Sequence, residues 1–418
     1  MFALVDANSF YCSAEQVFRP QWRGKPIIVL SNNDGCIVAA NKQAIALGIK
    51  KFEPYFKVKN FCEYAGIIVC SSNYELYADL SHKMMQVIGR FAPTQHIYSI
   101  DESFLSFDDC HSAIPDLAIH AQKIRQAVWK EIRLPVCVGI GKTLTLAKVA
   151  NHVAKKWSGF NGICVLDNDA LQQQVFSQLN PSDVWGIGRK TAQKLKQNGV
   201  TTAQQLSKLN MHFLPVGFSV ELTRTIKELN GEICKTWDGV RADKLQIFST
   251  RSLGKRIISA ESLNQALAKH AGIAALKARE QKSLCSTLMV FAANSPFDET
   301  PCSYKILKQF NPPTNDTSQF LNIISNNIHQ LYKPGIAYYK VGVGLLSLSS
   351  EKNQQWDLFE PPAGNGQLMN VLDQINQRYG SDSAFLAAQG IDEKWSMRRA
   401  LLTPQYTTNW RHIPHISC

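Results

Sequence analysis

The chain has 418 residues, which is too long for one ordinary hydrophobic core and predicts two to four domains. Its 45% hydrophobic and 10% aromatic residues are typical of a globular protein, and it contains no apolar run of 18 residues, which argues against a membrane span. A formal net charge of +12 favours polyanionic partners. Residues 235–350 hold 14 Lys and Arg against 7 Asp and Glu, whereas residues 351–418 hold 6 against 7, so the candidate nucleic-acid surface precedes the tail.

The beginning of the chain and its cysteines indicate a cytoplasmic protein. The opening MFALVDANSFY lacks the basic and long apolar regions of a signal peptide. Eleven cysteines are scattered without a CxxC pair or a His cluster at metal-ligand spacing. We therefore expect free thiols in a reducing compartment, and neither a disulfide framework nor a zinc site.

The first 165 residues alternate between strand and helix patterns. Strands are predicted at residues 1–7, in WRGKPIIVL and in LPVCVGIG, and a hairpin is predicted around HIYSIDESFLSF. Helices are predicted at 9–17, in NKQAIALGIK up to Gly48, at 74–91, in AIHAQKIRQAVWKEI and in TLTLAKVANHVAKKW. This alternation predicts a sheet backed by helices.

The rest of the chain changes character several times. Residues 180–209 read as short helices around Gly-rich turns, and 236–244 as a linker. Strands return between residues 245 and 348 (LQIFSTRS, LCSTLMVFAA and YYKVGVGLLSL), with a helix near 263–282. Residues 351–418 are polar and are expected to be rich in loops.

Three carboxylates are candidates for one site. Asp6 ends the first strand, and Asp101 and Glu102 lie at the predicted hairpin. Adjacent residues of a regular strand face opposite sides, so Asp101 and Glu102 can share a site only where the strand bends or ends. Clustered carboxylates repel one another unless they are protonated or bind divalent cations, and Mg²⁺ or Mn²⁺ on such oxygens suits phosphoryl transfer. The alternative for a lone Asp-Glu pair is a solvated surface turn.

Basic residues after the third predicted strand are candidates for phosphate binding. GIGKTLTLAKVAN is not a P-loop, because GxxxxGK[ST] is absent. Lys148 can reach a triphosphate as a point charge, and the alternative is a solvated helical lysine.

Residues 180–200, NPSDVWGIGRKTAQKLKQNGV, have the spacing of a helix–hairpin–helix around Gly186 and Gly188. Backbone N–H groups at such a helix start bind a DNA phosphate, and Arg189, Lys190 and Lys194 add charge. An ordinary helical turn is the alternative.

QWDLF, at 355–359, follows the basic module within a polar stretch. Gln355, Leu358 and Phe359 could fill a partner's pocket as short peptide motifs do. The alternative is a strand fragment or a small core contact.

Together these stretches resemble the Y-family translesion DNA polymerases over nearly the whole chain. DANSFYCSAE (6–15), YSIDESF (98–104) and GIGKTLTLAKVAN (139–151) carry the resemblance. AAQGIDEKWSMRRALLTPQYTT (387–408) is similar to the UmuC-type branch, the catalytic subunits of bacterial DNA polymerase V.

The resemblance implies an α+β right-hand polymerase with a palm, fingers, a helical thumb and an α+β little finger. The implied boundaries are 1–10 and 73–165 for the palm, 11–72 for the fingers, 166–235 for the thumb, 236–244 for the linker, 245–350 for the little finger, and 351–418 for a tail with clamp- and partner-binding regions.

The resemblance also implies roles for individual residues. Asp6, Asp101, Glu102 and the main-chain carbonyl of Ala7 would hold two Mg²⁺ ions, with Mn²⁺ as an alternative. Tyr11 falls at the steric-gate position that excludes a ribose 2′-OH. The implied triphosphate contacts are Phe10 and Lys148, and the implied DNA contacts are Gly186, Gly188, Arg189, Lys190, Arg251, Lys255 and Arg256. Many members carry a Tyr and an Arg in a fingers pattern like NYxAR, where this chain has Lys42 and Ile45, so only Lys42 could supply a charge there.

The implied function is template-directed, error-prone synthesis past DNA damage in the SOS response. The implied partners are primer–template DNA, dNTPs, the β sliding clamp, a cleaved UmuD-type dimer and RecA, with no membrane. The expected location is the cytoplasm, at the nucleoid when active. Two alternatives are a palm-type nucleotidyl cyclase, which would not need the helix–hairpin–helix or the basic module, and a non-catalytic scaffold, which would not need the three carboxylates.

Overall fold

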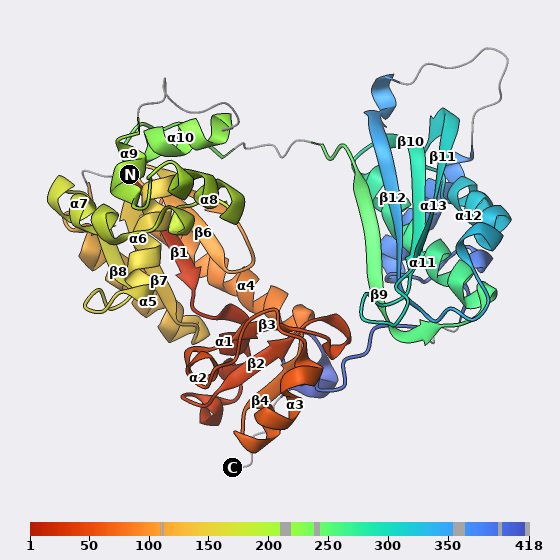
Figure 1. The fold of residues 1–418 in the computed structure, drawn as a ribbon, viewed down its shortest axis with the longest axis horizontal. Helices are drawn as coiled ribbons and strands as arrows, with labels where there is room; N and C mark the ends of the chain where they lie inside the picture. The colour runs from red at the N-terminus through yellow and green to blue at the C-terminus, as the bar shows by residue number, and fades with distance from the viewer. Residues whose placement is uncertain are drawn as a thin grey trace. The chain divides into compact units, whose positions relative to one another are not determined.

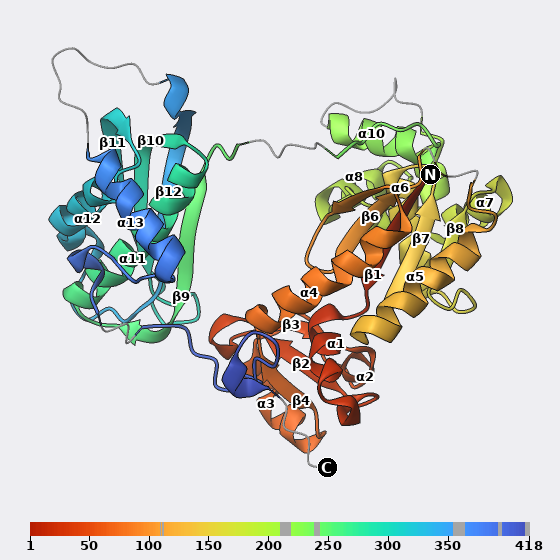
Figure 2. The same ribbon diagram turned by 180° about the vertical axis from the view of Figure 1, so that it is seen from behind.

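The structure is a computed structural model that describes residues 1–108, 110, 113–209, 219–237, 243–353, 364–391 and 395–413. The chain divides into two units. Unit 1 comprises Met1–Gly239 together with Leu401–Cys418, and unit 2 comprises Val240–Ala400 (Figures 1 and 2). The chain therefore leaves unit 1 once and returns to it near its end.

The apolar segment FALVDA forms the middle strand of the main sheet of unit 1. The strand order is β5-β6-β1-β7-β8, and β1 is antiparallel to both β6 and β7. Side chains alternate along β1, so that Ala3 and Val5 enter the core beneath α4 and α5, whereas Leu4 packs against α6. The elements are β1 (Phe2–Ala7), β5 (Thr94–Ile97), β6 (Glu102–Ser106), β7 (Val136–Gly141), β8 (Ile163–Leu166), α4 (Tyr74–Ile88), α5 (Leu117–Ile132) and α6 (Leu144–Lys156).

A second, smaller sheet follows β1 in the chain. Its order is β3-β2-β4, with β2 antiparallel to β3 and parallel to β4. Its four-residue strands are short, and an apolar cluster that includes Ile28, Leu30 and Ile37 holds them to the helices. The elements are α1 (Phe10–Val17), β2 (Ile27–Leu30), β3 (Ile37–Ala40), α2 (Lys42–Ala46), α3 (Tyr55–Tyr64) and β4 (Ile68–Ser71).

Short helices complete unit 1 and pack on the side of α6 away from the second sheet (Figure 1). Val149 and Val153 of α6 join Phe176, Leu195 and other apolar side chains of these helices in one core cluster. The elements are α7 (Asp169–Gln178), a 3₁₀ turn (Pro181–Asp183), α8 (Arg189–Gln197), α9 (Ala203–Ser207) and α10 (Val220–Leu229).

Unit 2 is an antiparallel sheet with helices on one face. The strand order is β11-β10-β12-β9, and α11 presents a row of alanines to the sheet, which lets the long helix lie close to it. The elements are β9 (Ile247–Ile257), α11 (Ala260–Glu280), β10 (Ser283–Ala293), β11 (Ser303–Thr314), α12 (Thr317–Leu331), β12 (Tyr338–Ser350) and α13 (Gly366–Tyr379).

The tail differs from the loop-rich region that its composition predicts. Residues 366–379 form α13, a helix capped by the Asn365 side chain, and its Met369 is fully buried. The residues that line one side of α13 are mostly polar, so a composition average hides the helix. Asp373 on this helix pairs with Arg279 of α11 at 2.7 Å, which ties it to unit 2.

Two properties of the described residues concern the environment of the chain. No helix in these ranges is long and apolar enough to cross a bilayer. The ten cysteines that the same ranges contain are all free thiols.

A buried histidine in unit 2 gives a prediction about stability in acid. His270 on α11 is 4% exposed and lies 2.8 Å from the Ser249 hydroxyl. Burial, together with the charges of Arg251 and Lys269, lowers its pKa to about 4. The unfolded chain, in which the histidine pKa is about 6.5, binds a proton on this side chain more tightly than the folded chain does. The free energy of unfolding therefore falls as the pH drops below about 6.5. The loss amounts to about 3 kcal/mol at most.

We therefore expect His270→Gln to flatten the fall of the free energy of unfolding between pH 7 and pH 4. Urea unfolding followed by circular dichroism measures it, with the exposed His329 on α12, changed to Gln, as the matched control. Equal pH slopes for His270→Gln and the wild type would contradict this account.

Candidate active site

Two of the predicted carboxylates lie opposite each other on neighbouring strands. Asp6 of β1 is the register partner of Glu102 of β6. Asp6 lies two residues after Leu4, and Glu102 lies two residues before Phe104. Leu4 and Phe104 belong to one apolar cluster that also includes residues of α6. Because side chains alternate along a strand, both carboxylates emerge on the face of the sheet that α6 covers.

Asp101 lies just before β6, in the turn that joins it to β5. The Ser99 hydroxyl donates to the Asp101 carboxylate at 2.7 Å and accepts from the N–H of Glu102 at 3.0 Å. The Ala7 N–H donates to the Asp101 carbonyl at 2.9 Å, which ties this turn to the end of β1. Asp101 and Glu102 thus meet the condition that adjacent acids need, because the strand begins between them.

Two lysines of α6 form ion pairs with two of these acids. Lys155 contacts Asp6 at 2.5 Å and Lys148 contacts Glu102 at 2.8 Å. Burial raises the pKa of Asp6 to about 6 against the opposing effect of Lys155, and the charges of Glu102 and Asp101 raise it further. The site therefore carries more negative charge than its buried surroundings favour.

The close approach of α6 to the sheet depends on glycines in β7. A Cβ added at Gly139 would lie 2.0 Å from the Asn151 backbone nitrogen, and one at Gly141 would lie 2.6 Å from Leu146 Cβ. The Asn151 amide donates to the carbonyls of Leu4 and Cys137 at 3.1 and 3.0 Å. The motif GIG therefore sets how closely α6 approaches the sheet, and this distance decides whether Lys148 and Lys155 can contact the acids.

Tyr11 lies beside the acids, on the wall of a cavity of about 210 Å³. Ser9 takes a left-handed conformation (φ 45°), which turns the chain from β1 into α1 and brings Phe10 and Tyr11 to this cavity. The Tyr11 ring stacks on Tyr77 with centroids 4.7 Å apart. The cavity is lined by Ala7, Ser9, Phe10, Tyr11, Val38, Ala39, Lys51, Ile100, Asp101 and Lys155.

The basic residues of this cavity differ from those that the sequence singled out. Lys51 and Lys155 line it, whereas Lys42, which is exposed at the start of α2, does not. Lys148 lies instead against Glu102 and aromatic rings, with its ammonium 4.3 Å from the Tyr98 ring and 5.3 Å from the Trp185 ring. The sequence could have pointed to Lys155, because it lies seven residues after Lys148 and therefore on the same face of the helix.

The oxygen atoms here suit a hard divalent cation, since carboxylates and a main-chain carbonyl are the ligands such ions take. Asp6 and Glu102 face their lysines, and among the described residues no three acidic, His or Cys side chains converge at metal-binding distances. The donor chemistry therefore fits such an ion, and Asp6 and Glu102 would have to part from their lysines to bind one.

The predicted helix–hairpin–helix contains one helical turn and one full helix. Gly186 has φ 89°, a conformation open to glycine, and Gly188 is the N-cap of α8. Gly188, Arg189 and Lys190 are all exposed. Exposed N–H groups and two cations therefore face outward at this helix start.

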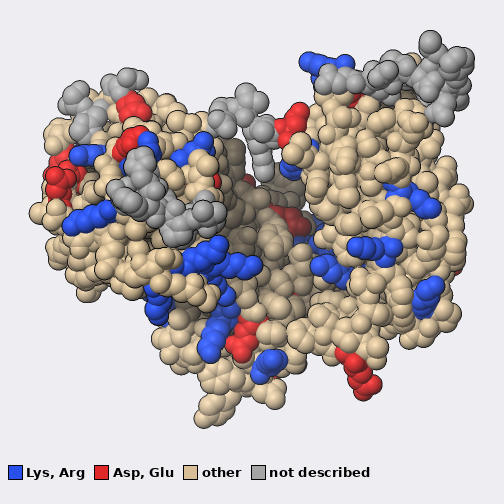
Figure 3. All heavy atoms as spheres, turned by 45° about the horizontal axis from the view of Figure 1, so that its top comes forward, with Lys and Arg blue, Asp and Glu red and all other residues tan. Residues whose placement is uncertain are grey.

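Three further predicted DNA contacts lie on β9 of unit 2. Lys255 and Arg256 are exposed, and Arg256 forms a bidentate pair with Asp298 at 2.7 Å. Arg251 is half-buried and lies 3.5 Å from the Met397 sulfur. Basic side chains spread over the surface of unit 2 with few acidic ones on the same face (Figure 3).

Comparison with known proteins decides the family. The model of the impB/mucB/samB family matches residues 5–152, and that of its C-terminal domain matches residues 244–358. The UmuC protein of Salmonella typhimurium is 39% identical over 419 residues, which cover 99% of each chain. The chain belongs to the impB/mucB/samB family of Y-family DNA polymerases.

Other relatives agree with this family. The MucB protein of Escherichia coli is 38% identical over 99% of each chain. DNA polymerase IV of Bacillus cereus is 28% identical over 90% of this chain and 89% of the relative. The function is therefore error-prone translesion DNA synthesis, and the chain is a DNA-directed DNA polymerase. Residues 366–416 match a model described as a domain of unknown function, DUF4113.

Solved structures show the same fold. A Y-family chimera of Dbh and Dpo4 aligns with a TM-score of 0.63 and 19% identity, and an insertion ternary complex of Dbh DNA polymerase with 0.53 and 20%. Each covers 84% of this chain and is covered completely. The predicted α+β right-hand polymerase fold is confirmed.

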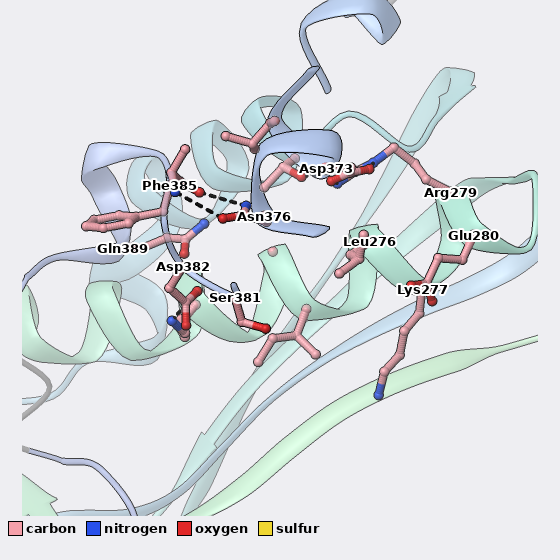
Figure 4. A pocket seen from close by; sticks show the side chains of 16 residues that line it. Leu276, Lys277, Arg279, Glu280, Asp373, Asn376, Ser381, Asp382, Phe385 and Gln389 are labelled. Atoms are coloured by element: carbon pink, nitrogen blue, oxygen red, sulfur yellow. Dashed lines mark hydrogen bonds and ion pairs between the residues drawn. The ribbon is translucent and has the colours of Figure 1, made fainter. Parts of the chain in front are cut away.

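The polymerase has other cavities that the three acids do not line. One of about 670 Å³ in unit 1 is lined by Trp185, Lys235 and Trp237 among others. One of about 370 Å³ in unit 2 lies between α11 and the segment after α13, where Asp373 pairs with Arg279 and Asn376 donates to the Ala384 carbonyl (Figure 4). Neither contains a predicted catalytic residue.

The predicted clamp-binding residues Gln355, Leu358 and Phe359 lie outside the described residues. So does much of the predicted 236–244 linker, of which residues 238–242 are not described.

Proposed function

We propose that Asp6, Asp101 and Glu102 are the catalytic residues of this polymerase. The observation that carries the proposal is the cross-strand pairing of Asp6 with Glu102, next to a turn that ties Asp101 to the end of the same strand. These carboxylates, with the Ala7 carbonyl, would hold two Mg²⁺ ions, or Mn²⁺. When bound, such ions activate a primer 3′-OH and offset charge that develops on the triphosphate.

The neighbouring residues would position the incoming nucleotide. Tyr11 would close the cavity on the sugar side and exclude a 2′-OH, and Phe10 would line the same pocket. Lys155 and Lys51 line this cavity and would bind phosphate oxygens as point charges. Lys155 would release Asp6 as it does so, so that nucleotide binding would free this carboxylate for an ion. Lys148, which the sequence predicts to contact the triphosphate, would have to leave Glu102 to reach it. Lys42 is the weaker candidate, because it is exposed outside the cavity lining.

DNA would be held by two sets of groups. The exposed start of α8, with Gly186, Gly188, Arg189 and Lys190, suits a backbone phosphate. Lys255 and Arg256, and to a lesser degree Arg251, would contact the duplex from β9. Since phosphate contacts dominate affinity, this binding carries no sequence preference.

The palm, fingers, thumb, linker, little finger and tail would have the boundaries that the sequence predicts. The partners would be primer–template DNA, dNTPs, the β sliding clamp, a UmuD-type dimer and RecA. The location would be the cytoplasm, at the nucleoid during DNA damage.

Primer extension by the wild type and by Asp101→Asn tests the catalytic proposal. Equal incorporation by the two proteins would end it.

The clamp proposal is tested separately. Changing both Leu358 and Phe359 to Ala removes the two large apolar side chains that would fill a pocket, so we expect clamp binding to be lost while extension of short primers stays at the wild-type level. Surface plasmon resonance on immobilised clamp measures binding, with Leu368→Ala on the exposed side of α13 as the control. Clamp affinity equal to that of the wild type would show that QWDLF is not the motif.

A further inference from the structure

The last described residues of the chain return to unit 1 and bind there. We call residues 401–413 the C-terminal strap. The N–H of Ser71, at the end of β4, donates to the Leu401 carbonyl at 2.9 Å, and the N–H of Leu401 donates to the Ser71 hydroxyl at 2.9 Å. The strap is therefore joined to the small sheet by a reciprocal pair of hydrogen bonds at its first residue.

Thr403 fixes the strap to the start of α4. The Asn73 side-chain amide donates to the Thr403 carbonyl and hydroxyl, each at 3.0 Å, and to the Pro404 carbonyl at 3.3 Å. Asn73 is also the N-cap of α4, where its oxygen accepts from the Leu76 N–H. One buried side chain thus holds both the strap and the helix that carries Tyr74 and Tyr77.

The Thr403 hydroxyl also forms a hydrogen bond with a buried carboxyl group on α1. It donates to Glu15 Oε1 at 3.1 Å, and the Tyr77 hydroxyl donates to the same oxygen at 2.6 Å. Glu15 is 1% exposed, and its other oxygen has no hydrogen-bond partner among the described residues. A buried carboxyl with so few partners loses much when one is removed.

Tyr77 connects this network to the nucleotide pocket. Its ring stacks on Tyr11 at 4.7 Å and 17°, and Tyr74 packs edge-on against both rings at 6.0 and 6.3 Å. Thr403, Glu15, Tyr77 and Tyr11 therefore form a continuous series of contacts from the strap to the ring that lines the cavity.

A second contact of the strap lies at the other end of α1. The Tyr406 ring stacks on Phe18 with centroids 4.7 Å apart, and its hydroxyl accepts from Arg19 Nε at 2.8 Å. The strap thus touches α1 after its last turn, while Tyr11 lies in its first turn. Both helices that hold the Tyr11 ring are tied to the strap.

We propose that the C-terminal strap is a sugar-specificity element, in which Thr403 is a positioning residue that holds Tyr11 through Glu15 and Tyr77. The proposal rests on the assignment of Tyr11 as the steric gate. It gives a role to the last part of the region that matches the domain of unknown function.

The test uses the full chain with its UmuD-type and RecA partners and measures kcat/KM for dCTP and for CTP opposite template dG. Thr403→Val keeps the shape of the side chain and removes its hydrogen bonds. Losing a buried hydrogen bond costs about 1 kcal/mol, so we expect the dCTP-to-CTP ratio to fall about five- to ten-fold. Thr403→Ser should restore the wild-type ratio, and Thr408→Val, at an exposed position of the same strap, should keep it.

Tyr406→Phe is a milder variant in case Thr403→Val does not fold. It removes the bond to Arg19, keeps the ring stack, and should lower the ratio in the same direction by a smaller factor. A wild-type ratio in a folded Thr403→Val variant would overturn the proposal, as would an equal loss of kcat/KM with dCTP and CTP. If that variant does not fold, a wild-type ratio in Tyr406→Phe would overturn it. Tyr11→Ala in the same assay separates the role of the strap from the role of Tyr11 as the steric gate. If Tyr11→Ala lowers the ratio and Thr403→Val does not, only the role of the strap fails. If Tyr11→Ala leaves the ratio unchanged, both roles fail.

Discussion

Asp101→Asn is expected to reduce dNTP incorporation by about three orders of magnitude or more, because an amide in place of a carboxylate supplies no charge to offset two divalent ions. The substitution keeps the size of the side chain, and the amide oxygen can still accept from Ser99, so the turn before β6 should remain intact. Single-turnover primer extension on an undamaged and an abasic template measures the effect.

A nearby aspartate provides the control for this experiment. Asp108 follows the same strand, β6, is exposed, and pairs with the N-terminal amine at 3.3 Å. Asp108→Asn removes one carboxylate charge near the same sheet and should leave incorporation at the wild-type level. If Asp101→Asn and Asp108→Asn behaved alike, the catalytic assignment would be wrong.

Tyr11→Ala is expected to lower the preference for deoxynucleotides by about 100-fold, the scale of discrimination that a packed wall gives against one added group. The loss would come from opening the cavity beside Asp101, because the ring, which packs against Phe10 and Tyr74, forms part of its wall. The ratio of kcat/KM for dCTP and CTP measures it.

Tyr64→Ala is the matched control for sugar selection. Tyr64 is the last residue of α3 and is 90% exposed, so its removal changes no packing around the nucleotide cavity. A Tyr11→Ala enzyme with unchanged sugar selection would show that another residue excludes the 2′-OH.

The sequence predicted much of the fold because the central elements have strong patterns. FALVDA and LPVCVGIG are short apolar runs, and α4, α5, α6 and α11 repeat their apolar residues at helical spacing. Asp6 and Glu102 could be placed together because each stands at the end of such a strand, and the strands proved to be neighbours.

Two elements were missed for different reasons. β11 is a sheet-edge strand whose sequence SYKILKQFNPPT mixes charges with two prolines, which strands rarely contain, so tertiary contacts decide its structure. α13 does carry a helical pattern, because Leu368, Val371, Leu372 and Ile375 repeat at helical spacing. The average composition of the polar tail hides this pattern.

The sequence could not predict contacts between residues that are far apart in the chain. Lys51 lines the cavity from the segment between α2 and α3. Thr403 contacts Glu15, which is 388 positions away in the chain. No spacing rule joins residues so far apart. Lys155 alone left a signal, because it repeats the face of Lys148 two turns later.

A crystal structure of the polymerase with primer–template DNA, a non-hydrolysable dNTP and Mn²⁺ tests the central claim most directly, because anomalous scattering locates the ions. We predict two Mn²⁺ about 3.5–4 Å apart, ligated by Asp6, Asp101 and Glu102, with Lys155 moved from Asp6 to the triphosphate. Ions bound elsewhere, with Asp6 and Glu102 still paired to their lysines, would contradict the account.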